Sequence, residues 1–163
     1  MSYHYENPAY QQRSFAAPRI TWAVQRLIFA NILVFAVQVV IDPMQAAVFA
    51  GYDVSVVIPG GVLNAWLGFQ PDWFLSGMLW KPFTYQFLHS GLMHLFMNML
   101  WLFFFGPDVE RALGTRQFFR FYLVCGVLGV LATLIPFVVS GWRPSVTGAS
   151  GAVMGVMVAF AVI

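Results

Sequence analysis

Five long stretches of this sequence carry no formal charge, and they constrain the fold more than any other feature. They cover residues 27–41, 54–71, 82–107, 121–142 and 144–163. A helix needs roughly 20 mainly apolar residues to cross the ~30 Å hydrocarbon core of a bilayer. Lipid is therefore the expected solvent for most of the chain, and the predicted fold is an all-α polytopic transmembrane helical bundle.

The composition excludes several classes of protein. Charged residues make up 9% of the 163 residues, far below the roughly 25% of a soluble domain. A net charge of +2 without a basic stripe argues against a nucleic-acid partner. The single cysteine, Cys125, excludes an internal disulfide and a cysteine-based metal cluster. We expect the lipid bilayer as a partner, and neither a cofactor nor a metal.

The predicted organisation is a polar tail followed by one membrane domain. The tail, residues 1–19, is rich in Tyr, Gln and Pro and is expected to be disordered, and the membrane domain covers residues 20–163. Predicted spans lie near residues 21–41, 91–111, 117–139 and 148–163. From Ser150 the last of them is only about 21 Å long at 1.5 Å per residue. The chain is therefore expected to be truncated, the N-terminal part of a longer protein.

The segment 42–81 is predicted to be an interfacial loop rather than a span. Pro59, the two glycines after it and Pro71 would break a helix there, and broken backbone facing lipid leaves polar groups unpaired. Six of the eight Lys and Arg residues lie on the opposite side of the predicted spans from this loop. Basic residues favour the cytoplasmic side, so we expect a multi-pass protein of the plasma or inner membrane with a cytoplasmic N-terminus.

Three polar side chains near the outer ends of two predicted spans call for a functional hypothesis. His94 and Asn98 are four residues apart and share a helix face, and Ser150 opens the last span. A serine hydroxyl can act as a nucleophile when a base takes its proton, and imidazole and amide groups can stabilise the resulting oxyanion. Gly148 and Gly151 would leave room beside Ser150 for a peptide.

A structural interpretation of the same residues stays open. Runs of small residues such as Gly148 to Ala152, with Gly155 following, usually mediate helix packing in membranes. Gly126 and Gly129 in the third predicted span would also allow close helix approach. His94 and Asn98 are commonly interhelical hydrogen-bonding groups. His89 lies just outside the second span, where an interfacial position is expected.

Three motifs resemble those of the rhomboid intramembrane serine proteases. The stretch from Trp80 to Asn98 (WKPFTYQFLHSGLMHLFMN) is similar to the family's second-helix region. Residues 106–114 resemble the Gly-x-x-x-Glu-x-x-x-Gly turn that follows that helix, and residues 148–151 match the Gly-x-Ser-Gly nucleophile motif. The resemblance extends from about residue 20 to residue 163. Lys81 departs from the Trp-Arg pair often seen in the family.

The resemblance implies a role for each candidate residue. Ser150 would be the nucleophile, and His94, Asn98 and the backbone N–H of Ser150 would form the oxyanion hole. Glu110 and Arg111 would be structural, and the first loop would lie beside the active site. The family's general base is a histidine on its sixth helix, so we expect that base beyond Ile163 and the present chain alone to be inactive.

Three functional hypotheses follow. The first is a serine endopeptidase that cleaves peptide bonds in or near the transmembrane segments of protein substrates through an acyl-enzyme on Ser150. The alternative is a catalytically inactive rhomboid-like protein that binds transmembrane helices. A transporter or channel ranks lowest, because the predicted spans lack interior charges. The sequence leaves the substrate and the oligomeric state open.

Overall fold

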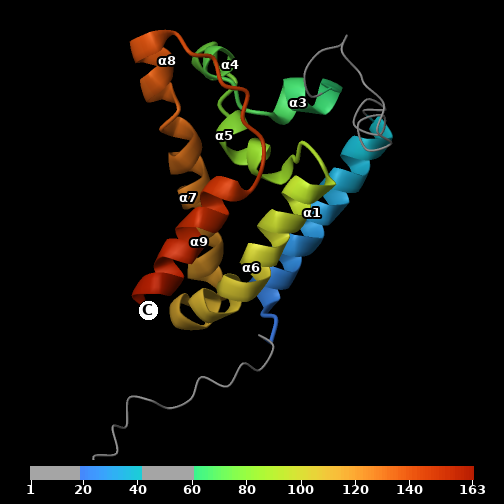
Figure 1. The fold of residues 1–163 in the computed structure, drawn as a ribbon, viewed down its shortest axis with the longest axis vertical. Coiled ribbons are helices and arrows are strands. Elements are labelled where there is room, and N and C mark those ends of the chain that lie inside the picture. Colours follow the sequence, from blue (N-terminus) through green and yellow to red (C-terminus); the bar gives the residue numbers. More distant parts are fainter. Residues whose placement is uncertain (1–18, 42–60) are drawn as a thin grey trace, which may run out of the picture.

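The computed structural model describes residues 19–41 and 61–163, and these are mainly helical. Within this part of the chain, β-structure is limited to one isolated antiparallel bridge between Phe69 and Val146. Residues 1–18 and 42–60 lie outside the described residues (Figure 1). Most of the predicted disordered tail, residues 1–19, and residues 42–60 of the predicted interfacial loop 42–81 lie outside the described residues.

Among the described residues, three helices are long and apolar enough to cross a membrane. They are α1 (Trp22–Ile41), α6 (Leu92–Leu113) and the continuous stretch Thr115–Ser140, which contains α7 (Thr115–Leu131) and α8 (Leu134–Ser140). A shorter apolar helix, α9 (Ser150–Val162), packs against α6 and α7. This confirms the prediction of a helical membrane bundle.

The third long segment departs from the sequence expectation, because it is interrupted between α7 and α8 rather than forming one regular helix. Pro136 follows the interruption and has no N–H to donate to the carbonyl four residues before it. The carbonyl oxygen of Ala132 instead accepts the N–H of Ile135 at 3.2 Å. The hydroxyl and the N–H of Thr133 donate to the carbonyl oxygen of Val130 at 2.6 and 3.0 Å. Bonds between residues three apart thus replace the regular helical pattern at the interruption.

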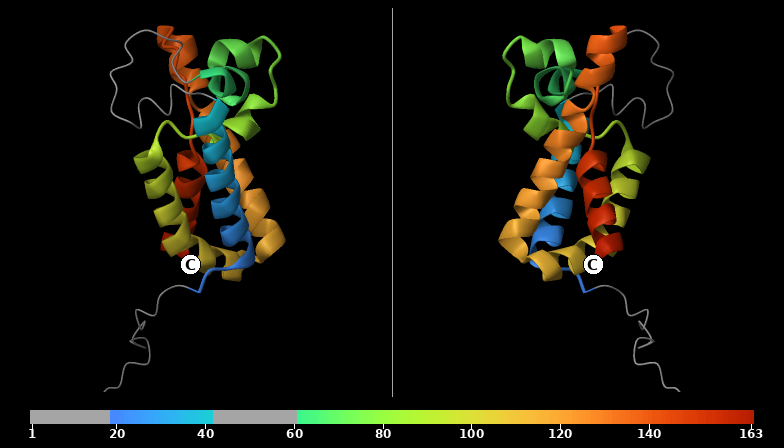
Figure 2. Two further views of the ribbon diagram at one scale, coloured as in Figure 1. Left: turned by 90° about the vertical axis from the view of Figure 1, so that its right-hand side faces the viewer. Right: turned by 90° about the vertical axis from the view of Figure 1, so that its left-hand side faces the viewer.

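The short helices gather at one end of the bundle. They are α3 (Gly61–Leu67), α4 (Pro71–Leu75), α5 (Lys81–Thr84) and the 3-10 helix η1 (Tyr85–Phe87). In Figures 1 and 2 they lie above the first turns of α6 and α9, which begin at a similar level of the bundle. The start of α9, where Ser150 lies, is therefore below the level of α3 and α4.

The core forms where α1, α6, α7 and α9 meet. Its fully buried members come from all four helices and include Val24, Leu102, Phe118, Tyr122 and Val156. Glycines let α7 and α9 approach closely: a Cβ on Gly129 would lie 3.4 Å from the Cα of Gly151. A Cβ on Gly155 would lie 2.5 Å from the Cys125 sulfur. These contacts confirm the predicted packing role of the small residues.

Glu110 ties the turn after α6 to the start of α1. Its carboxylate accepts the backbone N–H of Ala23 at 3.0 Å and of Val24 at 3.1 Å, and also the hydroxyls of Thr21 and Thr115. The first N–H groups of a helix have no partner within the helix, and a negative charge there is favourable. Arg111 pairs with Asp108 and donates to the carbonyl of Arg19. Both residues thus have the structural role that the resemblance implies.

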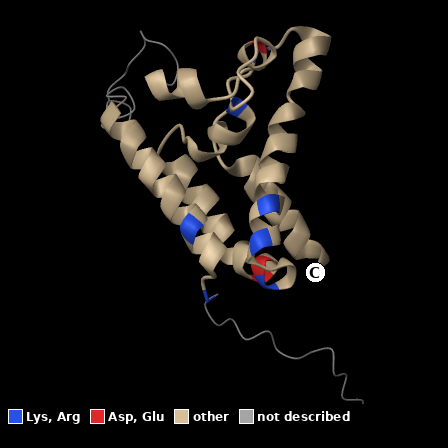
Figure 3. Ribbon diagram, turned by 180° about the vertical axis from the view of Figure 1, so that it is seen from behind, with Lys and Arg blue, Asp and Glu red and all other residues tan. Residues whose placement is uncertain are grey.

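The charged residues that the structure describes are concentrated at one end of the bundle. Figure 3 shows them mainly where α1 begins and where α6 turns into α7, with few at the opposite end. The middle of the bundle carries almost none, as expected for a segment that lies in hydrocarbon.

Candidate active site

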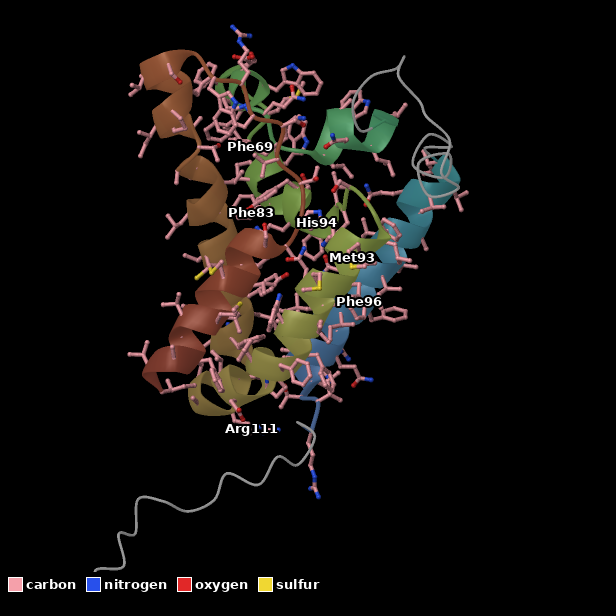
Figure 4. All side chains as sticks on the ribbon, in the orientation of Figure 1. Phe69, Phe83, Met93, His94, Phe96 and Arg111 are labelled. Carbon is pink, nitrogen blue, oxygen red and sulfur yellow. The ribbon has the colours of Figure 1, made fainter. Side chains whose placement is uncertain are left out.

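The imidazole of His94 lies against the backbone that leads into α9. His94 is in the first turn of α6, and its Nδ1 is 3.0 Å from the hydroxyl of Ser90. A Cβ built on Gly148 would lie 2.5 Å from His94 Cε1 and 2.7 Å from Nε2. Gly148 also has φ of +113°, a conformation that L side chains rarely adopt. Figure 4 shows His94 between α6 and the segment entering α9. Both the close approach of His94 and the backbone conformation therefore require glycine at position 148.

Ser150 is the first residue of α9 and is exposed. The two residues before it, Gly148 and Ala149, are buried. Within the described residues, the Ser150 side chain makes no hydrogen bond. Its position at a helix start leaves its own backbone N–H without a helical acceptor. The hydroxyl and the N–H are thus both available to a ligand that reaches this end of α9.

The connection before Ser150 is held by the segment between α3 and α4. Phe69 and Val146 exchange two backbone hydrogen bonds, of 3.0 and 2.9 Å. Arg143 and Asp72 form an ion pair of 2.6 Å. Because these contacts lie within a few residues of Ser150, they limit where the start of α9 can move.

Asn98 lies one helical turn after His94 and is nearly buried, with 5% of its surface exposed. Its side-chain amide donates to the carbonyl oxygen of His94 at 2.9 Å. No described hydrogen bond joins Asn98 or His94 to Ser150. The structure therefore places His94 against the Ser150 motif, while the meeting of all three side chains at one reacting atom stays a prediction.

Tyr85 is a supporting residue that sequence reasoning missed. Its hydroxyl donates to the carbonyl oxygen of Gly126 at 2.6 Å, and its own carbonyl accepts the N–H of Gly148 at 3.0 Å. Its oxygen would lie 3.2 Å from a Cβ on Gly151. Burial raises the pKa of Tyr85 to about 12, so the phenol keeps its proton. Tyr85 thus contacts α7 and Gly151 through its hydroxyl, and Gly148 through its backbone carbonyl.

His89 lies just before α6, and its interfacial position stays a prediction. Its side chain is completely buried within the protein. Its ring contacts that of His94 edge-on, with centroids 5.2 Å apart, and Gln38 of α1 accepts its backbone N–H at 2.9 Å. Burial first, and the neighbouring His94 second, lower the pKa of His89 to about 4. At neutral pH it is therefore an uncharged packing partner of His94.

Lys81, the residue that departs from the family's Trp-Arg pair, is fully buried, and its ammonium group makes two hydrogen bonds. Its ammonium donates to the carbonyl oxygens of Ala65 at 2.6 Å and Gly68 at 2.9 Å. It also lies 4.2 Å from the centroid of the Trp73 ring. Burial lowers the pKa of Lys81 from its ordinary value. The lysine therefore links α5 to the last residues of α3 and to Gly68, which follows it.

Fold and site together define a helical integral membrane protein. Ser150 begins the apolar helix α9, and His94 of α6 packs against Gly148, two residues before that serine. The Rhomboid domain family matches residues 76–163, and the chain belongs to the rhomboid family. The matched residues include all five candidate site residues: His94, Asn98, Gly148, Ser150 and Gly151.

Two curated relatives agree with this assignment. "Rhomboid protease GlpG" of Salmonella choleraesuis (strain SC-B67) is 32% identical over 105 residues, which cover 64% of this chain and 37% of that protein. "Putative rhomboid protease YdcA" of Bacillus subtilis (strain 168) is 35% identical over 80 residues, 49% of this chain and 39% of that protein. The matched stretch thus spans less than two fifths of either relative.

Proposed function

We propose that this chain carries the nucleophile and oxyanion hole of a rhomboid-type intramembrane serine endopeptidase. The observation that supports it most is the contact of the His94 ring with Gly148, two residues before the exposed Ser150. The substrates would be transmembrane proteins, because the proposed site lies within a bundle of membrane helices.

In the proposed reaction the Ser150 oxygen attacks a peptide carbonyl, and its proton passes to a general base. The carbonyl oxygen becomes an oxyanion and accepts hydrogen bonds from His94 Nε2–H, the Asn98 amide and the Ser150 N–H. If the Ser90 hydroxyl donates to His94 Nδ1, the ring proton resides on Nε2, which faces the Ser150 motif. The amine then leaves with a proton from the base, and water hydrolyses the acyl-serine.

The general base in this proposal is a histidine contributed by the polypeptide beyond Ile163. His89 is neutral, but its side chain is completely buried, its ring packs edge-on against that of His94, and its backbone N–H donates to Gln38 of α1. The relatives are much longer than the matched stretch, which leaves room for such a residue. Loss of one member of a nucleophile–base unit lowers rates by orders of magnitude. The 163 residues alone would therefore be inactive.

The proposed orientation places the charged end of the bundle in the cytoplasm. Arg19, Arg26, Arg116 and Arg120 lie toward that end, where α1 begins and where α7 begins. Basic residues near span ends favour the cytoplasmic side. The first turns of α6 and α9 would then lie toward the outer leaflet, and substrates would be cut there.

The test is cleavage of a transmembrane reporter by the protein expressed from the complete gene. Ser150→Ala should abolish cleavage, because the nucleophile is lost. Ser145→Ala is the matched control, since Ser145 is an exposed serine of the same connection, and it should cleave normally. Cleavage unchanged by Ser150→Ala would overturn the proposal. A protein that binds the reporter but never cuts it would favour the inactive helix-binding alternative.

A further inference from the structure

The outer surface of α1 carries a groove near the helix start. It has a volume of about 450 Å³, and its lining includes Trp22, Gln25, Arg26, Phe29 and Ile32. Phe29 is 67% exposed and Ile32 is 49% exposed, so this face of α1 is not covered by the other described helices. In a membrane the groove would be open to lipid.

Arg26 is an unpaired cation in this groove. It is exposed and makes neither a hydrogen bond nor an ion pair with any described residue. Two other described arginines differ: Arg111 pairs with Asp108, and Arg143 pairs with Asp72. The nearby carboxylate of Glu110 is already occupied by the first N–H groups of α1. The charge of Arg26 therefore lacks compensation from the described protein.

An aromatic platform fixes the position of this cation. The guanidinium carbon of Arg26 lies 3.4 Å from the centroid of the Trp22 ring, one turn toward the helix start. The Trp22 ring in turn meets Phe119 of α7 edge-on, with centroids 6.0 Å apart. Arginine near a span end extends toward the headgroups in this way, and tryptophan is favoured at the same depth. The geometry thus presents the guanidinium at headgroup level.

We propose that this groove binds a phospholipid with net negative charge. Its phosphate would accept paired hydrogen bonds from Arg26, a contact that suits the planar guanidinium. The Gln25 amide lies beside it and can donate to the same headgroup. An acyl chain would lie along Phe29 and Ile32.

The site can be tested on the full chain in detergent by native mass spectrometry, with phosphatidylglycerol and phosphatidylcholine of identical acyl chains. The wild type should retain phosphatidylglycerol about fivefold more than phosphatidylcholine, as expected for one cation near the surface. Arg26→Gln should lose this preference. Arg143→Gln, an exposed arginine at the opposite end of the bundle, should keep it. Inorganic phosphate should not displace the lipid.

Three results would overturn the proposal: equal retention of both lipids by the wild type, an undiminished preference in Arg26→Gln, or displacement by inorganic phosphate. A photoactivatable phosphatidylglycerol gives an independent measurement on unaltered protein. Its adducts should map to residues 20–32, and adducts confined to other segments would also contradict the site. The groove lies at the end of the bundle where α1 begins, and the start of α9 lies toward the other end (Figure 1). These results therefore do not depend on the activity of Ser150.

Discussion

His94 of α6 and Gly148, which precedes α9, are in direct contact. The ring of His94 leaves no room for a side chain at position 148. A Cβ on Gly148 would lie 2.5 Å from His94 Cε1. This contact joins the second long apolar helix to the serine motif, and it therefore couples helix packing to the geometry of the candidate site.

Gly148→Ala should disable the candidate site in the protein expressed from the complete gene. The methyl group would displace the His94 ring and also strain a backbone with φ of +113°. A displacement of about 1 Å at a reacting centre can cost about 100-fold in rate. Reporter cleavage should fall by about that factor.

Gly141→Ala separates the two effects of this substitution. Gly141 also has a left-handed φ, of +69°, but a Cβ there would meet nothing within 4 Å. It should therefore reduce stability without the same loss of cleavage. Full activity of Gly148→Ala would show that the His94 contact has no bearing on catalysis.

Tyr85→Phe should destabilise the protein by about 1 kcal/mol, because it removes the hydrogen bond from the phenol to the carbonyl oxygen of Gly126. The ring itself stays in place, so packing against Phe69 is retained. Unfolding in a denaturing detergent, followed by circular dichroism, measures the change. A midpoint equal to that of the wild type would contradict the linking role of this side chain.

Glu110→Gln should destabilise by about 3 kcal/mol, because a neutral amide replaces a carboxylate that accepts the first N–H groups of α1 and two hydroxyls. Asp108→Asn is the control: its ion pair with Arg111 is exposed and contributes at most about 1 kcal/mol. Equal unfolding free energies for the two variants would rule out a special role for Glu110.

The stability of the fold should rise with pH between about 4 and 6.5. The pKa of His89 is about 4 in the folded protein and 6.5 ordinarily, so the unfolded state binds more protons over this interval. The contribution is present above pH 6.5 and is lost progressively as the pH falls toward 4. By linkage it is of the order of 3 kcal/mol.

His89→Gln removes this titrating group and should flatten the pH dependence. The measurement is the unfolding free energy at pH 5 and pH 7.5 in both proteins. An identical pH dependence in the variant would place the titrating group elsewhere.

The long helices could be predicted because their signal is local. Uncharged stretches of sufficient length mark α1, α6 and the segment Thr115–Ser140, and small residues mark the contact of α7 with α9. The position of Ser150 at a helix start follows from the glycines around it. The same signals cannot show an interruption such as that before Pro136, which depends on neighbouring hydrogen bonds.

The supporting contacts could not be predicted, since they join residues far apart in sequence. Tyr85 meets Gly126 and Gly148, and Gln38 meets the backbone of His89. A tyrosine or histidine in a neutral stretch has no pattern that reveals such a partner. The burial of His89 in particular depends on α1 packing beside it, and nothing in its own neighbourhood of the sequence indicates this.

The central claim is that Ser150 is a nucleophile positioned beside His94. The most direct measurement is labelling of the protein expressed from the complete gene with a fluorophosphonate, followed by mass-spectrometric mapping of the adduct. The account predicts one adduct, on Ser150, that is lost in Ser150→Ala and strongly reduced in His94→Ala. An adduct on another serine, or labelling that persists in Ser150→Ala, would contradict it.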